Sequence, residues 1–315
     1  MTEKRTVTVC GATGQQGGSV ARAILADEDG GFAVRAVTRD PDSEAARELK
    51  RLGAEVVRAD MDDAASLAPA FEGVYGAYLM TNFWEHASAE REKAQAAALA
   101  QAAGHAGVQH AIWSTLEDTR ECIPLDDDRM PTLQGSYKVP HFDAKAEADG
   151  YFTDDGVPTT FLRLTFFWDN LFGLFAPQRG EDGALELTFP MGDRRLSGIA
   201  VDDIGTTALA IFKGGTDFIA ATVSIAGEHL PVADMAAVLG ETLGEPVRYR
   251  PMDPDAYRAL GFPYAEEVGN MFQYYADCEA RFTSARDLDA VRAINPALQD
   301  FATWAAAHRD RFQLS

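Results

Sequence analysis

The sequence predicts an α/β protein built on a doubly wound parallel sheet. Short runs of β-branched and apolar residues alternate with stretches of helical periodicity through the first half of the chain. The first run, residues 7–10, stops at a glycine-rich turn, and a helical pattern starts directly after it. Helices between strands imply right-handed crossovers, so the strands should be parallel and covered on both faces. Together these features predict a Rossmann-type domain over residues 1–165.

The expected elements of this domain follow one another in order along the chain. Strands are predicted at Val7–Cys10, Phe32–Thr38, Glu55–Ala59, Gly76–Met80, His110–Ser114 and Thr159–Leu164. Helices are predicted at Ser19–Leu25, Ser43–Leu52, Ala64–Phe71, Ser88–Ala106 and His141–Asp154. The strand segments are short and rich in β-branched or aromatic residues, whereas the helical segments repeat apolar residues three or four positions apart.

Residues 166–315 change character and predict a smaller α+β region. The segments 185–189 and 196–200 flank a Pro-Met-Gly-Asp turn and are interpreted as a β-hairpin. Short strands at 222–226 and 246–251 follow around a helix, and the rest of the chain has mostly helical patterns. Ligands of open α/β sheets bind beyond the carboxyl ends of the strands, so we expect the substrate or partner site in the crevice between the two parts.

The glycine-rich turn after the first strand has the spacing of a dinucleotide-binding loop. Gly11 permits a tight turn off the strand, and Gly14 lets the backbone approach a pyrophosphate. Gly17 or Gly18 lets the helix pack close to the sheet, and its first turn directs free N–H groups at the anion. The alternative is a tight turn without a ligand. The loop residues expected to bind the cofactor are Gly11, Thr13, Gly14, Gln15, Gln16 and Gly17.

The end of the second strand predicts which nucleotide binds. An NAD site usually offers an acidic residue to the ribose 2′-hydroxyl here, about 20 residues after the glycine loop. This chain has Thr38 and Arg39 instead, and a guanidinium can hold a 2′-phosphate through bidentate charge-assisted hydrogen bonds. NADP(H) is therefore the predicted cofactor. Two alternatives stay open: Arg39 is a solvated loop arginine, or Asp40 acts as the acid of an NAD site.

Further candidate residues follow the carboxyl ends of the other strands. Asp60, Met61 and Asp62 come after the third strand and are expected to flank the adenine ring. A single aromatic residue is more often part of the core than of a pocket. Aromatic residues are concentrated after two strand ends here, which indicates that some of them line the cofactor and substrate site. The remaining expected cofactor contacts are Thr81, Asn82, Phe83, Ser114, Lys145, Phe166 and Asn170.

Composition excludes several classes of function. The formal net charge of −21 argues against direct nucleic-acid binding, which needs a basic face. The sequence has no apolar run of about 18 residues and no signal-peptide pattern, so no membrane span is expected. The six histidines lack metal-ligand spacing, so no metal is expected. Cys10, Cys122 and Cys278 show no paired spacing, which suits a reducing cytoplasm better than a disulfide scaffold.

Three residues before and within the last helix of the domain are candidates for catalysis. His141 and Lys145 project from one helix face, a turn apart. In a hydride-transfer enzyme the lysine would hold the nicotinamide ribose hydroxyls and lower the pKa of a neighbouring acid. Plainer interpretations are a surface lysine near Glu147 and a helix-start histidine without chemistry. Tyr137, four residues before His141, is the third candidate.

These residues also carry a resemblance to a known family. The chain resembles the NmrA-like family of atypical short-chain dehydrogenases/reductases, and most of all its HSCARG branch of NADPH sensors. The resemblance implies a Rossmann fold, a preference for NADP(H), and often regulation through partner proteins rather than turnover. Its motifs span nearly the whole chain, at Gly11–Gly18, Val37–Arg39, Thr81–Glu85, His141–Lys145, Gly156–Pro158, Leu260–Pro263 and Asn270–Phe272.

One departure from the family pattern decides the expected function. Short-chain dehydrogenases normally use Tyr-x-x-x-Lys, with the tyrosine as general acid toward a carbonyl oxygen. Here His141 stands at the tyrosine's position and Lys145 is kept, a substitution that the HSCARG branch shares. The resemblance therefore implies an NADP(H)-responsive sensor or regulator, in which the cofactor reshapes loops such as 117–140 and changes a surface for a protein partner.

An enzyme is the alternative. Reductases of the wider family manage with the lysine alone, and Tyr137 could swing toward the nicotinamide. An NADPH-dependent reductase of a small carbonyl or quinone in the crevice therefore stays open. A homodimer is a further candidate assembly, and a cytoplasmic location is expected for either function.

Overall fold

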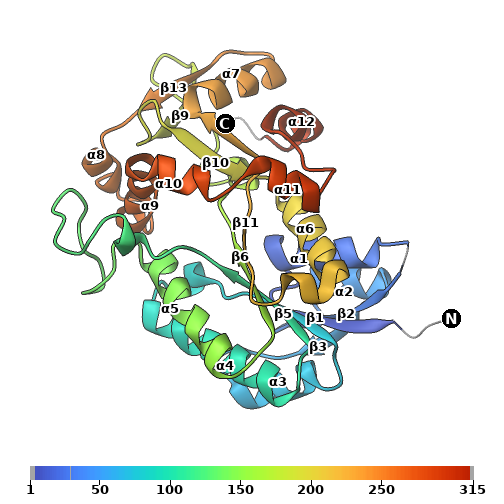
Figure 1. The fold of residues 1–315 in the computed structure, drawn as a ribbon. Coiled ribbons are helices and arrows are strands. Elements are labelled where there is room, and N and C mark those ends of the chain that lie inside the picture. The colour runs from blue at the N-terminus through green and yellow to red at the C-terminus, as the bar shows by residue number, and fades with distance from the viewer. Residues whose placement is uncertain (1–3, 29, 313–315) are drawn as a thin grey trace. The chain divides into compact units, whose positions relative to one another are not determined.

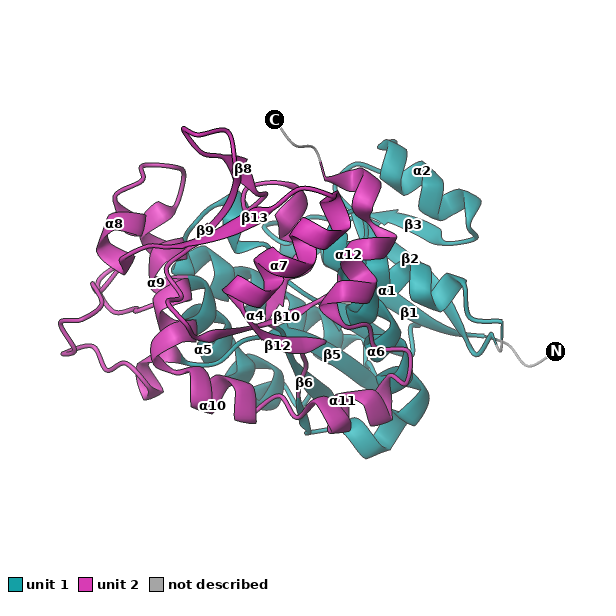
Figure 2. Ribbon diagram, turned by 90° about the horizontal axis from the view of Figure 1, so that it is seen from above, with its two compact units in different colours: residues 1–118, 141–164, 201–223 teal, residues 119–140, 165–200, 224–315 magenta. Residues whose placement is uncertain are grey.

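The computed structural model describes residues 4–28 and 30–312, and the chain divides into two compact units (Figure 1, Figure 2). Unit 1 comprises residues 1–118, 141–164 and 201–223. Unit 2 comprises residues 119–140, 165–200 and 224–315. The chain therefore passes between the units several times, whereas the sequence suggested one boundary at residue 165.

Unit 1 is built on a seven-stranded sheet in the order β11-β6-β5-β4-β1-β2-β3. Neighbouring strands from β3 to β6 pair in parallel, and Val7 of β1 lies opposite both Val34 and Gly76. The order reverses between β1 and β4, so the carboxyl ends of these two strands form the switch point where such sheets bind ligands. The strands are β1 (Arg5–Val9), β2 (Phe32–Thr38), β3 (Glu55–Arg58), β4 (Gly76–Leu79), β5 (His110–Thr115), β6 (Thr159–Arg163) and β11 (Thr222–Ser224).

Helices connect these strands and cover both faces of the sheet (Figure 1). The apolar faces of α3, α4 and α5 pack with strand side chains such as Leu79 and Trp113 in one buried cluster. The predicted doubly wound α/β fold is confirmed, because amphipathic helices bury the apolar central strands on both sides. The helices are α1 (Gln15–Leu25), α2 (Glu44–Arg51), α3 (Ala64–Phe71), α4 (Ala89–His105), α5 (Pro140–Asp154) and α6 (Val201–Gly214), with 3-10 helices η1 (Phe83–Glu85) and η4 (Gly215–Phe218).

Residues 201–223 belong to unit 1 because α6 packs closely against α1. A Cβ atom on Gly205 would overlap the carbonyl group of Ser19, so a side chain there would force the two helices apart. The Lys213 ammonium also lies 2.7 Å from the Asp27 carboxylate. The pairing of α6 with α1 could not be predicted from the sequence, since the close approach of two helices leaves little local signal beyond a glycine.

Unit 2 contains two three-stranded sheets, β12-β10-β7 and β13-β9-β8. The predicted hairpin is wrong, because β9 pairs with β8 and β13 whereas β10 pairs with β7 and β12. Turn residues indicate where a strand ends, but its partner depends on the burial of side chains that are distant in sequence. The strands are β7 (Phe166–Phe167), β8 (Gln178–Arg179), β9 (Leu185–Phe189), β10 (Arg195–Ile199), β12 (Glu228–Pro231) and β13 (Val247–Pro251).

Helices and an aromatic core complete unit 2. The rings of Phe166, Phe175, Phe189 and Phe272 contact one another, and the centroids of the last two are 4.6 Å apart. Such clusters bury a large apolar area and dominate the stability of a small core. The helices are η2 (Thr119–Glu121), η3 (Trp168–Phe172), α7 (Val232–Leu243), α8 (Pro254–Arg258), α9 (Ala265–Asp277), α10 (Glu279–Ser284), α11 (Leu288–Ile294), α12 (Phe301–Ala307) and η5 (Arg309–Arg311).

A disulfide joins Cys122 and Cys278, which corrects the expectation from their spacing. The two residues are separated by 156 positions, so no local sequence pattern could predict this disulfide. Cys10 stays free and is buried in the core of unit 1, where burial raises the pKa of its thiol to about 12. The disulfide fastens the start of the loop at residues 119–140 to the end of α9.

Hydrogen bonds hold the same loop further along. The Asn270 amide donates to the carbonyl oxygens of Pro131 at 2.9 Å and Lys138 at 2.6 Å. The Lys138 ammonium donates to the carbonyl oxygens of Asp127 at 2.8 Å and Met130 at 2.7 Å. The loop that was expected to be reshaped by the cofactor is therefore held firmly within unit 2.

Candidate functional site

The glycine loop between β1 and α1 is a tight turn with no room for side chains. Gly11 has a φ of +64°, which favours glycine, and a Cβ atom there would overlap the Met80 sulfur. A Cβ atom on Gly17 would overlap the Cys10 carbonyl oxygen, so Gly17 sets the close approach of helix and strand. Gly14 is the N-cap residue of α1 and is exposed, as is Gln15. The turn thus presents the first N–H groups of α1 at the switch point.

Two expected cofactor-binding residues contact each other behind this loop. The buried Gln16 amide donates to the Tyr78 hydroxyl at 2.7 Å and to Ser114 Oγ at 2.6 Å. These bonds use both amide protons and link α1 to the ends of β4 and β5. A role for Gln16 or Ser114 toward a cofactor stays a prediction, and for Gln16 it would fall to the backbone N–H in the first turn of α1.

Arg39 follows β2 and forms a forked ion pair with Glu85 of η1. Its two terminal nitrogens lie 2.8 and 3.0 Å from the two carboxylate oxygens. The Asn82 amide also donates to this carboxylate, at 3.1 Å. Both side chains of the pair remain substantially exposed, at 59% for the arginine and 43% for the glutamate. The guanidinium is therefore within reach of solvent and already engaged by an anion.

The residues expected beside an adenine ring lie at the end of β3. The Asp60 carboxylate accepts the Asp62 N–H at 3.0 Å, and the Asp60 N–H donates to Ser66 Oγ at 2.8 Å. Met61 packs against the apolar cluster under α3 and α4. Asp60 and Met61 are half-buried and Asp62 is exposed, and their role beside an adenine ring stays a prediction.

Lys145 is buried and all three of its ammonium protons have acceptors within unit 1. Its Nζ lies 2.7 Å from Thr81 Oγ1, 3.3 Å from the Thr81 carbonyl oxygen, and 2.9 Å from Glu92 Oε1. The Thr81 hydroxyl in turn donates to Glu92 at 2.5 Å. The interpretation of Lys145 as a surface lysine beside Glu147 is wrong, because Glu147 pairs with Lys93 instead.

Glu92 is a fully buried carboxylate that the sequence reasoning missed. Burial alone would raise its pKa, but the Lys145 charge and hydrogen bonds from neighbours lower it to about 2. Its second oxygen faces His86 Nε2 at 3.5 Å. His86 Nδ1 accepts the Ser88 N–H at 3.1 Å, so the ring carries a proton on Nε2, the nitrogen that faces the carboxylate. Glu92 therefore stays ionised inside a closed polar cluster.

His141 lies at the start of α5 among aromatic rings. Its centroid is 4.8 Å from those of both Trp84 and Phe142, and 5.8 Å from that of Phe83. Phe83 is buried and Trp84 is partly exposed, both on η1. The segment 81–86 therefore contacts Arg39 through Glu85, Lys145 through Thr81, and His141 through its two aromatic residues.

Asp149 is a half-buried carboxyl group, one turn after Lys145. Burial raises its pKa to about 6, against hydrogen bonds from Thr115 at 2.6 Å and Trp113 at 2.9 Å that lower it. Both bonds end on the same carboxylate oxygen. Unlike Glu92, this group has neutral donors as its hydrogen-bond partners, and its pKa is raised and not lowered.

Three expected site residues belong to unit 2. Tyr137 is buried, pairs through its backbone with Leu133, and has the Arg120 guanidinium 5.4 Å from its ring centroid. Phe166 is part of the aromatic core. Asn170 accepts the N–H of Gly173 through its carbonyl oxygen, at 3.2 Å, within η3. Their roles toward a cofactor or substrate stay predictions.

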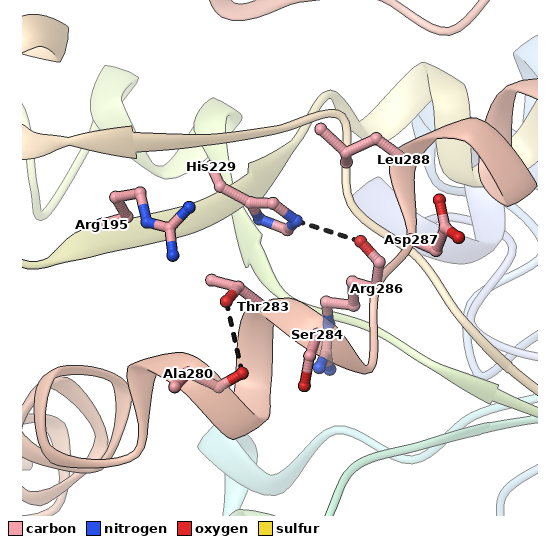
Figure 3. A pocket seen from close by; sticks show the side chains of 8 residues that line it. All are labelled: Arg195, His229, Ala280, Thr283, Ser284, Arg286, Asp287 and Leu288. Atoms are coloured by element: carbon pink, nitrogen blue, oxygen red, sulfur yellow. Dashed lines mark hydrogen bonds between the residues drawn. The ribbon is translucent and has the colours of Figure 1, made fainter.

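Unit 2 also has an open pocket of about 470 Å³ between β10, β12 and α10 (Figure 3). His229 Nε2 donates to the Arg286 carbonyl oxygen at 3.0 Å, and its Nδ1 lies 2.7 Å from Ser197 Oγ. Burial lowers the pKa of His229, so the ring is neutral. Arg195 Nε lies 2.5 Å from Glu279. The His229 ring and the Arg195 guanidinium, which line this pocket, therefore already have partners within unit 2.

Nearly the whole chain matches one known protein family. The NmrA-like family matches residues 3–303. The chain belongs to the NmrA-like family. Among its relatives, the oxidoreductase FrzB of Cladobotryum sp is 28% identical over 301 residues, covering 90% of this chain and 88% of the relative. The oxidoreductase malD of Malbranchea aurantiaca is 30% identical over 264 residues, covering 79% and 76%.

Solved structures of this NmrA-like fold agree with the architecture. NmrA, a negative transcriptional regulator crystallised with NADP, superposes with a TM-score of 0.79 at 23% identity, covering 96% of this chain and 94% of that one. The Citrobacter sp. triphenylmethane reductase complexed with NADP(H) gives 0.74 at 20% identity, covering 95% and 99%. At these identities the comparison establishes the fold.

Several groups of this NmrA-like site escaped the sequence reasoning although signals existed. Glu92 lies on the same helix face as Ala96, Leu99 and Ala103, so it could have been recognised as a buried charge that needs a partner. Glu85 has no such signal, because its pairing with Arg39 spans 46 positions. Within residues 4–28 and 30–312, no cluster of three metal-ligating side chains and no helix long and apolar enough to span a membrane is found.

Proposed function

We propose that this NmrA-like protein binds NADP(H) through the β1–α1 loop and Arg39 and acts as a redox-responsive sensor or regulator. The geometry of the β1–α1 loop is the observation that supports binding of this cofactor. Gly11 and Gly17 leave no room for side chains, while the first-turn N–H groups of α1 open at the sheet's switch point. A pyrophosphate matches this arrangement of donors and helix dipole. Relatives of this fold crystallised with NADP or NAD support the same cofactor class.

The contacts of Lys145 and His141 support a sensor and not an enzyme. When bound, NADP(H) would supply a transferable hydride, and turnover needs a group that protonates the substrate. Lys145 donates all its protons to Thr81 and Glu92, and His141 is packed among aromatic rings. Neither side chain is arranged to deliver a proton. As in the NADPH-sensing HSCARG branch, the cofactor would then serve as a signal, read by a protein partner in the cytoplasm or by a second copy of the chain.

A reductase of a small carbonyl or quinone is the second candidate, because FrzB and malD are named oxidoreductases and the triphenylmethane reductase shares the fold. In that function Tyr137 would be the acid. The two functions predict different outcomes with the same reagents, since only an enzyme consumes NADPH.

The proposal is tested by calorimetric NADPH binding and by NADPH consumption with a panel of quinones, aldehydes and imines. We expect binding without consumption. Gly14→Val should abolish binding and keep the fold, since Gly14 is exposed and has an extended backbone that any residue adopts. A Cβ atom there would lie 3.3 Å from the Gly11 carbonyl oxygen, a close contact that a small shift of the loop relieves. A folded Gly14→Val protein that still binds NADPH would refute the loop assignment. Brisk turnover that is lost in Tyr137→Phe would establish the reductase instead.

A further inference from the structure

Glu85 and Arg39 form a contact that resembles the one a 2′-phosphate would make. Both Arg39 terminal nitrogens point at the two carboxylate oxygens, at 2.8 and 3.0 Å. Guanidinium groups bind carboxylates and phosphates with this same fork, so the two anions compete for one set of donors. The Asn82 amide, 3.1 Å from the carboxylate, holds Glu85 in this orientation.

We propose that Glu85 is a specificity-determining residue, which must leave Arg39 before the 2′-phosphate of NADP(H) can bind there. This inference rests on the proposed binding of NADP(H) at Arg39. NAD(H) lacks the phosphate and leaves the Arg39–Glu85 pair closed. Glu85 therefore weakens NADP(H) binding but not NAD(H) binding, and it moderates the preference that Arg39 creates.

The release of Glu85 has a structural consequence because of its position on η1. Trp84, the preceding residue, packs on the His141 ring at 4.8 Å between centroids. Thr81, four residues before Glu85, holds the Lys145 ammonium at 2.7 Å. Opening the pair removes the tie between η1 and the end of β2. Binding of a 2′-phosphate at Arg39 would thus change the position of segment 81–86, and with it the contacts that this segment makes with His141 and Lys145.

The exchange is feasible because the pair is exposed. Exposed ion pairs contribute little to stability, since water screens them and two long side chains must be ordered. A doubly charged phosphate binds the same fork more strongly than a carboxylate does. Removing the competitor should therefore strengthen NADP(H) binding by about two- to fivefold.

Calorimetry with NADP⁺ and NAD⁺ on the full chain tests this, using Glu85→Gln, Arg39→Ala and the double variant. We expect Glu85→Gln to bind NADP⁺ about two- to fivefold more tightly, with NAD⁺ unchanged and no gain in the Arg39→Ala background. Asp42→Asn is the matched control, because it removes an exposed charge beside α2 that accepts no ion pair from Arg39. It should change neither affinity.

Tryptophan fluorescence supplies a second readout. The difference between wild type and Trp84→Phe should change with NADP⁺ and stay constant with NAD⁺. The inference is overturned if Glu85→Gln raises the affinity for both nucleotides equally, or if Asp42→Asn raises the affinity for NADP⁺ as much as Glu85→Gln does. Either result would show that only the loss of a negative charge matters. Unchanged or weaker NADP⁺ binding in Glu85→Gln would overturn it as well. Wild-type protein that binds neither nucleotide would instead refute the proposed function, and the inference with it.

Discussion

Two ion pairs of unit 1 have similar distances but lie in opposite environments. The closest Lys145–Glu92 atoms are 2.9 Å apart, with side chains 10% and 0% exposed. Those of Arg39 and Glu85 are 2.8 Å apart, with side chains 59% and 43% exposed. Water screens only the second pair, and only the first would leave an unpaired buried charge when broken. The buried pair is therefore part of the architecture, whereas the exposed pair can exchange its partner for a ligand.

This difference changes how the expected cofactor residues should be interpreted. Arg39 can release its carboxylate at little cost, so a role toward a phosphate is compatible with its present contact. Lys145 can donate to a ribose only by giving up Thr81 or Glu92, which hold its three protons. The position of Lys145 in the sequence is therefore not enough to assign it a contact with the ribose.

The largest expected effect comes from breaking the buried pair. Lys145→Ala should lower the free energy of unfolding by about 3–5 kcal/mol, because it leaves the Glu92 carboxylate buried without its cation. Urea unfolding at neutral pH measures the loss, and Arg39→Ala is the matched control for the exposed pair, with an expected loss below about 1 kcal/mol. Equal losses in the two variants would contradict the comparison.

Asp149, whose hydrogen-bond donors Trp113 and Thr115 are neutral, extends the same comparison to the pH dependence of stability. The pKa of Asp149 is raised from 3.8 to about 6 by burial, so its contribution to stability is full below pH 3.8 and is lost as the pH rises through 6. Asp149→Asn keeps an oxygen for the Thr115 and Trp113 hydrogen bonds and removes the charge. It should raise the free energy of unfolding by about 2–3 kcal/mol at pH 8 and leave it unchanged near pH 3.5.

Glu92 should show the opposite dependence. Its pKa is lowered from 4.5 to about 2, so its contribution is full above pH 4.5 and is lost as the pH falls through 2. Urea unfolding of wild type and Glu92→Gln between pH 2.5 and 6 measures this, and the difference between them should shrink as the pH falls. A constant difference across this range would show that the lysine does not hold the carboxylate ionised.

The sequence predicted the parts of unit 1 that depend on local patterns. Strand β2, helix α3 and the glycine loop follow from periodicity and turn residues, and they lie where expected. The ionic partners of Arg39 and Lys145 could not be predicted, because 46 positions separate Arg39 from Glu85 and the pairing depends on the packed fold. The disulfide of Cys122 and the separate sheets of β9 and β10 escaped for the same reason.

The smallest expected effect concerns the exposed pair and the choice of cofactor. Arg39 offers its fork at the end of β2, so NADP(H) should bind at least tenfold more tightly than NAD(H), about 1.4 kcal/mol. Arg39→Ala should remove most of this preference with little change in stability, because its ion pair is exposed. Calorimetry of both nucleotides at matched salt measures the ratio, and raising the salt should reduce it, since an exposed phosphate contact is screened. Equal affinities in the unmodified protein would show that the guanidinium keeps Glu85 as its partner and that Arg39, like Lys145, belongs to the architecture.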